Sequence, residues 1–180
     1  MNVIKRYLKM KGAPAERRLS SWHDAVWCWF GAFSGMAIVG WLSSLSMNAQ
    51  QPLPMMSSFG ATSVLLYAAP ESPLAQPRNV IGGSTLSALV GVSCWQWLGE
   101  GWLAAAVAIA CAILVMQMTN TLHPPGGVAA LVAITGSPEL HALGWHYALM
   151  PVASGCLVML TVAVLVNNLA RHRRYPRHWR

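Results

Sequence analysis

Long apolar stretches dominate the chain, and charged residues interrupt them only rarely. Uncharged intervals lie between Asp24 and Glu71, Arg78 and Glu100, Glu100 and Glu139, and Glu139 and Arg171. A helix that spans a membrane needs about 20 predominantly apolar residues, so these intervals have room for several such helices. The pattern predicts an all-helical protein that is integral to a membrane.

The apolar pattern divides into long and short segments. Four segments are long enough to be full transmembrane helices: about 25–47, 79–98, 102–119 and 146–169. Two segments are too short to span alone and are predicted as half-helices: about 58–69 and 124–135. The expected organisation is a basic cytoplasmic lead over 1–22, a transmembrane domain over 23–170 and a basic cytoplasmic tail over 171–180.

The sequence also contains a weak internal repeat. The stretch Gly60–Leu66 aligns with Gly126–Val132, 66 positions later, and a proline-bearing link follows each short segment. Each half then has the order long span, short segment, link, long span. Short hydrophobic segments at matching positions in two halves are the sequence feature that best indicates a transporter's binding site.

The direction of the short segments has two alternatives. If both cross the membrane obliquely, each half has three passes, the halves are inverted, and Arg78 lies on the cytoplasmic side. If both re-enter, four crossings remain and the halves run parallel. About 14 residues of helix reach only about 21 Å of a hydrocarbon core roughly 30 Å thick. We therefore favour four full spans with two re-entrant half-helices.

Composition and charge support the membrane assignment. The chain is 55% hydrophobic and 9% charged, whereas about 25% of the residues of a soluble domain are charged. The net charge of +7 comes from basic residues upstream of Asp24 and from Arg171 onward. Basic clusters that flank membrane spans fix topology more often than they bind nucleic acid. Both termini are therefore expected in the cytoplasm, near anionic lipid, and no nucleic-acid partner is expected.

Chemically reactive side chains are sparse. The four cysteines fall within apolar runs, without the spacing of a zinc site: Cys28, Cys94, Cys111 and Cys156. Buried thiols that act as small packing residues are the simplest interpretation. The sequence has no nucleophile–base pair, paired-carboxylate site or phosphate-binding loop. We expect no enzyme activity, no cofactor and no bound metal.

The most distinctive stretch is Thr121–Gly127, which reads Thr-Leu-His-Pro-Pro-Gly-Gly. Prolines suit the first turn of a helix, where their missing N–H groups would be unpaired anyway. The two glycines let backbone approach another helix or a ligand. A helix that begins here directs N–H groups and the positive end of its dipole toward His123, which favours an anion. A helix start that only packs closely is the alternative interpretation.

Arg78 and His123 are the candidate charged and titratable groups. Arg78 is the only basic residue between Arg18 and Arg171. It is either an interfacial anchor or the counter-charge of an anion, and Glu71 is its nearest acidic candidate partner in sequence. Since histidine titrates near neutral pH, His123 is interpreted as a proton-linked or gating group, with helix capping or packing as the alternative.

The predicted substrate-binding residues gather around the two half-helix starts. They are Ser58, Phe59, Gly60, Arg78, Asn79, Gly83, Ser84, Asn120, His123, Pro124, Pro125, Gly126 and Gly127. Arg78 is expected to supply charge. The backbones of Ser58–Gly60 and Pro125–Gly127 are expected to supply N–H donors. Polar lining is expected from Asn79 and Asn120.

These motifs resemble the HPP family of small integral membrane proteins. The residues that carry the resemblance are Ser58-Phe59-Gly60-Ala61 with Val64-Leu65-Leu66, the string from Ser72 to Gly83, Leu122 to Gly127, and Asn167-Asn168. The match extends from about Glu16 to Trp179. The resemblance implies a four-span transmembrane region and, as in some photosynthetic relatives, nitrite transport. Ser84 departs from the family pattern, in which a histidine often follows the paired glycines, and this weakens the inference of nitrite transport.

Two functional hypotheses follow. The first is a transporter or channel for a small inorganic anion such as nitrite, in a bacterial inner membrane. Faces of small residues indicate helix partners beyond one chain, so a homo-oligomer is expected. The alternative is a non-transporting scaffold or accessory subunit, in which the proline and glycine motifs serve packing alone.

Overall fold

The computed structural model describes residues 21–46, 52–170 and 172–179. The expected basic lead, apart from its last two residues, and most of the first loop lie outside the described residues. Within the described ranges the chain is helical, with turns and short links and without a strand. The prediction of an all-helical protein is confirmed.

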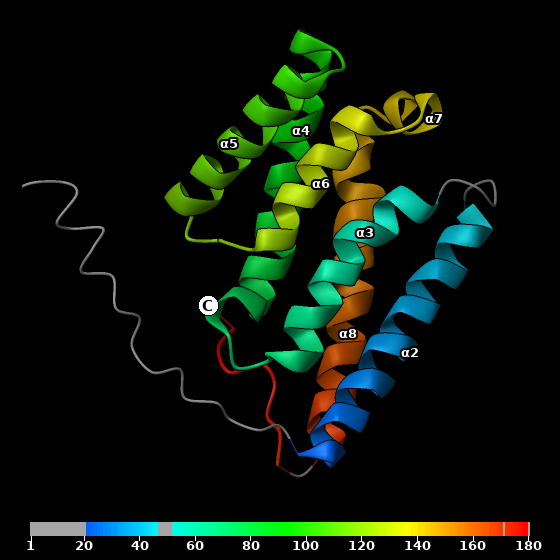
Figure 1. The fold of residues 1–180 in the computed structure, drawn as a ribbon, viewed down its shortest axis with the longest axis vertical. Coiled ribbons are helices and arrows are strands. Elements are labelled where there is room, and N and C mark those ends of the chain that lie inside the picture. Colours follow the sequence, from blue (N-terminus) through cyan, green and yellow to red (C-terminus); the bar gives the residue numbers. More distant parts are fainter. Residues whose placement is uncertain (1–20, 47–51, 171, 180) are drawn as a thin grey trace, which may run out of the picture.

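Six long helical segments make up the described bundle (Figure 1). They are α2 (Trp22–Ser46), α3 (Pro52–Ser63) with η1 (Val64–Ala68), η3 (Asn79–Gly83) with α4 (Ser84–Leu98), α5 (Trp102–Met118), α6 (Pro124–Thr135), and η4 (Ala148–Ala153) with α8 (Ser154–Leu169). Two short elements, η2 (Pro73–Ala75) and α7 (Pro138–Ala142), lie in the links. By length and composition, Trp22–Leu45 and Ala148–Leu169 are the two helices of the described residues that can cross a membrane by themselves.

The first short segment differs from the prediction, because α3 begins at Pro52 rather than near residue 58. Its prolines lie in the first helical turn, where a missing N–H leaves no bond unmade. Met56 of α3 lies close to Gly40 of α2, and Tyr67 of η1 lies close to Gly31, nearer the start of α2. The segment therefore lies antiparallel to α2 along most of its length (Figure 1).

Successive segments of the bundle alternate in direction (Figure 1). α4 and α6 run parallel, because Ser87 lies at Gly126 and Gly91 lies further along at Ala130. In the second half, α5 runs opposite to α2, α6 opposite to α3, and α8 opposite to α4. This is the order of directions that the inverted alternative predicts, and it differs from the favoured re-entrant arrangement in the direction of α3. The path of the chain through a membrane stays a prediction.

The two links share a local structure. Ser72 caps η2 by accepting the N–H of Leu74 at 3.2 Å. Ser137 caps α7 by accepting the N–H of Leu140 at 3.4 Å. Each link leads into a π-helical segment, η3 or η4, at the start of the third long helix of its half. The order of elements therefore repeats, with the two links at opposite ends of the bundle (Figure 1).

Aromatic rings fill the core between α2, α3 and α8. Tyr67 lies against Gly31 and Gly35, and Phe59 lies against Gly155. Large apolar side chains are exposed on the outer faces of the long helices, among them Trp29, Phe33, Trp41, Leu103, Leu114, Met118, Leu157 and Leu165. Exposed apolar area of this extent is unusual for a soluble monomer and is typical of a lipid-facing surface.

We expect the substitution Gly155→Ala to destabilise the fold by about 1–3 kcal/mol. An alanine Cβ would lie 2.7 Å from Cε1 of Phe59, whose ring is almost fully buried and has little room to move. Gly60→Ala is the matched control, because a Cβ there meets no atom within 4 Å. Unfolding of both variants in detergent checks the prediction, and equal stability would contradict it.

Candidate functional site

His123 lies inside the bundle, next to the first link, where α6 begins beside α3 and η2. Its side chain is fully buried. Nδ1 lies 2.8 Å from the carbonyl oxygen of Leu74, and Nε2 lies 3.1 Å from the hydroxyl of Thr62. A carbonyl can only accept, so Nδ1 carries the proton and Nε2 accepts from Thr62. The geometry is that of a neutral imidazole with both nitrogens paired.

This geometry bears on the proton-linked role predicted for His123. A second proton would turn Nε2 into a donor and would remove the acceptor that the Thr62 hydroxyl now uses. As it stands, the ring joins the first link to the start of α6 and to α3. The described contacts therefore support a clamp, and the proton-linked or gating role stays a prediction.

The start of α6 supplies no free N–H donor, which corrects the expectation for Pro125–Gly127. Pro124 and Pro125 have no N–H, and the N–H of Gly126 donates to the carbonyl of His123 at 2.8 Å. The two prolines thus remove the donors that make other helix starts good anion sites. What remains for an anion is the positive end of the helix dipole.

The expected donors at Ser58–Gly60 are also absent, because these residues lie inside α3 and their N–H groups belong to the helix. Ser58 acts through its side chain, whose buried hydroxyl donates to the carbonyl of Pro125 at 2.9 Å. Phe59 is buried in the core against Gly155. The stretch joins α3 to α6 and does not present a helix start.

Arg78 lies at the end of the bundle where Tyr175 and Arg177 contact the first link. Its side chain is exposed, and Nη2 donates to the carbonyl of Thr119 at 3.0 Å, at the C-terminus of α5. A cation at this position is favoured by the helix dipole. Glu71 is not its partner, because that carboxylate pairs with Arg177.

The two asparagines occupy the same neighbourhood. The side-chain amide of Asn79 donates to the carbonyl of Leu122 at 2.9 Å. Asn120 is exposed and has a φ of 53°, which an asparagine tolerates better than most residues. Of the two asparagines predicted to line the site, Asn79 therefore supports the segment before α6, and Asn120 faces outward at its turn.

Gly83 and Ser84 mark a close contact between α4 and the segment before α6. A Cβ on Gly83 would lie 2.8 Å from Cβ of His123 and would overlap the carbonyl oxygen of Thr121. Ser84 follows it and is buried beside Cys156. Gly127, by contrast, has open space around its Cα.

The sequence interpretation missed Thr62 and Ser87. Thr62 follows Ser58 by one helical turn, so the pair lies on one face of α3, and both side chains contact the start of α6. Ser87 is the other omission: its buried hydroxyl lies directly against Gly126.

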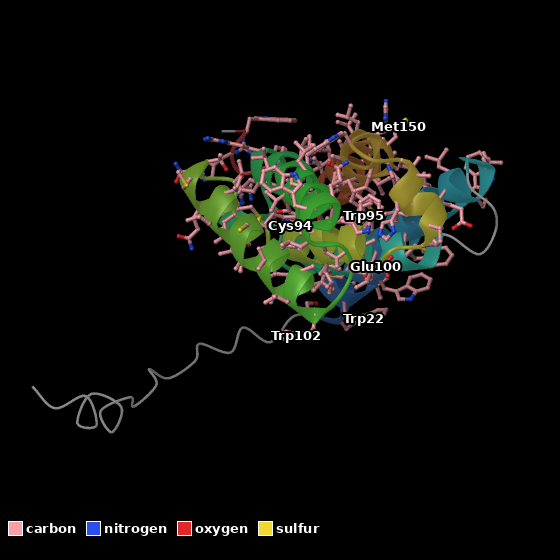
Figure 2. All side chains as sticks on the ribbon, turned by 90° about the horizontal axis from the view of Figure 1, so that it is seen from above. Trp22, Cys94, Trp95, Glu100, Trp102 and Met150 are labelled. Carbon is pink, nitrogen blue, oxygen red and sulfur yellow. The ribbon has the colours of Figure 1, made fainter. Side chains whose placement is uncertain are left out.

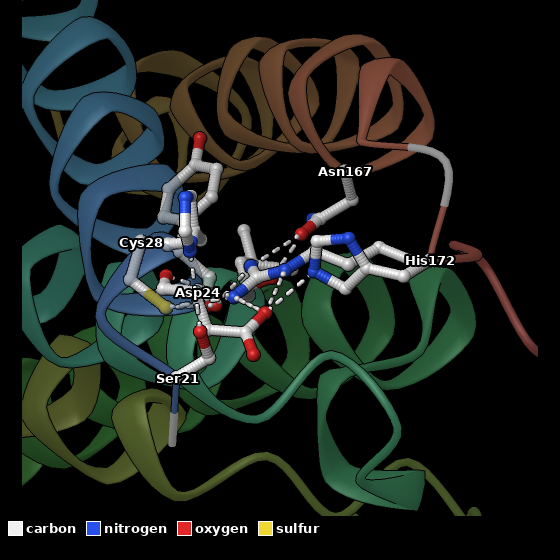
Figure 3. A network of polar contacts seen from close by, with 9 residues as sticks. Ser21, Asp24, Cys28, Asn167 and His172 are labelled. Atoms are coloured by element: carbon white, nitrogen blue, oxygen red, sulfur yellow. Dashed lines mark hydrogen bonds and ion pairs between the residues drawn. The ribbon is translucent and has the colours of Figure 1, made fainter.

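The C-terminal residues close one end of the bundle (Figure 3). Arg173 is largely buried and donates to Asp24 at 3.1 Å, to the carbonyl of Tyr67 at 3.0 Å and to Asn167 at 3.3 Å. His172 also pairs with Asp24, at 2.6 Å. The tail was interpreted as a topological signal, whereas Arg173 also bonds α2, η1 and α8 together.

The opposite end of the bundle carries Trp95 and Glu100, which are labelled in Figure 2. The rings of Trp95 and His141 stack with centroids 4.1 Å apart. His141 directs one ring nitrogen to the carbonyl of Ala133 at 3.2 Å and the other toward Glu100 at 3.6 Å. The second link is thereby joined to the turn between α4 and α5.

Comparison with known proteins gives a family and two relatives. The family model described as "HPP, transmembrane region" matches residues 17–176. A transmembrane protein of Dictyostelium discoideum is 36% identical over 185 residues, which cover 99% of this chain and 65% of the relative. A second transmembrane protein of that organism is 37% identical over 180 residues, which cover 98% of this chain and 58% of the relative. The chain thus spans less than two thirds of either relative. No solved structure gives a significant match.

We expect His123→Ala to lower the free energy of unfolding by about 1–3 kcal/mol or more, because it leaves the Leu74 carbonyl and the Thr62 hydroxyl buried without this partner. His146→Ala, at an exposed histidine, is the control. A double-mutant cycle with Thr62→Val should give a coupling energy of about 0.5–3 kcal/mol. Additive effects in that cycle would contradict the clamp.

Proposed function

The chain belongs to the HPP family of transmembrane proteins, and we propose that it transports a small inorganic anion, such as nitrite, across a membrane. Its relatives are described as transmembrane proteins, so contact with a lipid bilayer follows from family membership. The substrate, the route and the topology below are parts of the proposal. Location in a bacterial inner membrane stays a prediction.

In the proposed topology all six segments pass through the bilayer, and the two halves are inverted. The alternating directions of the helices and the two matching links support this arrangement. α6 has 12 residues, or about 18 Å of helix, so it is a half-helix that begins inside the bundle. Arg78, Arg173 and Arg174 then share one side of the membrane, which the positive-inside rule makes cytoplasmic.

Labelling of single cysteines tests the topology. In a variant without the four native cysteines, Glu71→Cys should react with a membrane-impermeant thiol reagent from the same side as Arg174→Cys. Glu100→Cys should react from the opposite side. The re-entrant arrangement reverses the sides of positions 71 and 100, so vesicles of known orientation distinguish the two arrangements.

The observation that carries the transport proposal is the start of α6 within the bundle, beside buried hydroxyl groups. Polar groups inside a membrane domain are costly, and where they occur they tend to mark substrate pathways. Half-helices whose N-termini point inward are a recurring way to hold anions in transporters. Here the start of α6 lies side by side with Ser87 and Gly83 of the neighbouring segment.

The proposed route runs from Arg78 along the contact of α4 with α6. Arg78 attracts an anion to one end of the bundle, since its side chain is exposed and its described contact is a carbonyl. Glycine, serine and alanine line the contact itself, so a small shift of α6 relative to α4 would open space for a small ion. The conformation described here corresponds to a closed state of that route.

A second candidate is a non-transporting scaffold, and one observation favours it. The centre around His123 is filled, and two described hollows lie elsewhere on the bundle. One, of about 380 Å³, has Val39, Phe59 and Gly155 among its lining residues, and the other has Ile81 and Leu160. Both are apolar. If the protein is a scaffold, the polar side chains around His123 hold the half-helix in place and transport no ion.

Homo-oligomer formation belongs to the proposal as well. Helix faces rich in small residues favour close helix contacts in membranes, and exposed apolar side chains on α2 and α5 leave room for a second copy. A scaffold and a transporter share this expectation, so it does not discriminate between them.

Uptake by sealed liposomes that contain the purified protein tests transport. We expect saturable flux of nitrite, compared with nitrate, formate and chloride, in the wild-type protein. Arg78→Gln should reduce flux at least about 10-fold, because a buried or steered anion loses its counter-charge, and Arg78→Lys should retain part of it. Arg174→Gln, at another exposed arginine, should transport normally.

Absence of wild-type flux above empty liposomes, with inserted and folded protein, would favour the scaffold. Normal flux in Arg78→Gln would exclude Arg78 from the route without excluding transport.

A further inference from the structure

Serine and threonine side chains inside the helices of this protein generally bond back to their own helix. The described examples are Ser34 to Phe30 (2.7 Å), Ser93 to Leu89 (2.8 Å), Thr135 to Leu131 (3.1 Å) and Thr161 to Leu157 (2.9 Å). Each hydroxyl donates to the carbonyl one turn earlier, which is the usual way to satisfy such a group in an apolar environment.

Three hydroxyls in the first turn of α4 do not follow this rule. Among the described residues, the buried oxygens of Ser84, Thr85 and Ser87 have no hydrogen-bond partner. Ser87 is 0% exposed and Ser84 is 1% exposed. The Ser84 hydroxyl also lies against the thiol of Cys156, which accepts hydrogen bonds only weakly, so Ser87 is the more fully unpaired of the two. Buried polar groups without a partner are rare in folded proteins and call for an explanation.

A π-helical segment lies immediately before these hydroxyls. The carbonyls to which they would bond back belong mainly to residues 80–83, which lie in η3 (Asn79–Gly83). π-Helical turns are often found at functional sites.

The unpaired hydroxyl of Ser87 points at the start of α6. A Cβ added to Gly126 would lie 2.9 Å from Oγ of Ser87 and 3.0 Å from the carbonyl oxygen of Gly83. Since the first residues of α6 are prolines, that helix end has a positive dipole but lacks N–H donors of its own. The hydroxyls of α4 are the donors that can complete it.

We propose that Ser84 and Ser87, together with the N-terminus of α6, form the anion-binding point of the transport route; this inference rests on the proposed function. The ligand class is a small, singly charged oxyanion, which accepts hydrogen bonds on its oxygen atoms. Among the described contacts at Gly126 there is no cationic side chain, and both ring nitrogens of His123 already have partners. A second negative charge would be too costly to desolvate there.

The variants that test the site are Ser84→Ala, Ser87→Ala and the double variant. Ser93→Ala is the matched control, because Ser93 lies on the same helix and its hydroxyl is already bonded. Removal of an unpaired hydroxyl should leave the unfolding temperature without ligand unchanged or higher, whereas removal of a structural hydroxyl would lower it. A role in structure and a role in binding are thereby separated.

Two readouts are measured on each protein: stabilisation against thermal unfolding by nitrite or formate, and uptake of the same ions by liposomes. Binding stabilises the folded state by an amount that grows with the logarithm of the ligand concentration relative to Kd. Loss of one hydrogen bond to a charged ligand should raise the half-maximal concentration about 10- to 100-fold in each single variant. Ser93→Ala should behave as the wild-type protein.

The outcomes separate the two proposals. Wild-type flux with unchanged half-maximal concentrations in the double variant would overturn the hydroxyl site and leave transport intact. Stabilisation that the double variant loses, without flux in any protein, would support the site and overturn transport. Neither stabilisation nor flux in the wild-type protein would overturn both.

Discussion

The close approach of α4 and α6 is the constraint on which the rest of the structure depends. A Cβ on Gly91 would lie 2.6 Å from the carbonyl of Ala130, and Gly83 and Gly126 are comparably enclosed. Without side chains at these positions, two backbones can run side by side, as small residues permit in membranes. Only then can the 12-residue α6 begin inside the bundle with Pro125, Gly126 and Ala129 buried.

A helix that begins there leaves non-helical backbone at its start, and a membrane supplies no water to satisfy it. Side chains from other elements do so. Arg78 donates to the carbonyl of Thr119, Asn79 to that of Leu122, and Ser58 to that of Pro125. His123 returns a bond to Leu74 in the first link. The polar residues that the sequence indicates as ligand-binding thus form hydrogen bonds with backbone groups. The unpaired hydroxyls of α4 are the exception.

Much of this arrangement follows from sequence, because membrane insertion imposes simple rules on charge and length. Uncharged intervals indicate the long helices, and the prolines after His123 indicate where α6 begins. The start of α3 could not be read in the same way, since Pro52 is equally compatible with a loop and with a first helical turn. The pairing of Asp24 with Arg173 joins residues 149 positions apart, and no local pattern specifies such a contact.

The start of α6 shows that a motif typical of a helix start does not by itself supply the hydrogen-bond donors of an anion site. Proline is favoured at a helix start because it lacks an N–H, and for the same reason it cannot donate to an anion. A Pro-Pro start therefore keeps the dipole but gives up the hydrogen bonds, so an anion held there needs donors from elsewhere. Unpaired hydroxyls lie at that level of the bundle, directly after the π-helical turn that precedes α4. The two irregularities, one in each half of the chain, thus complement each other at one point.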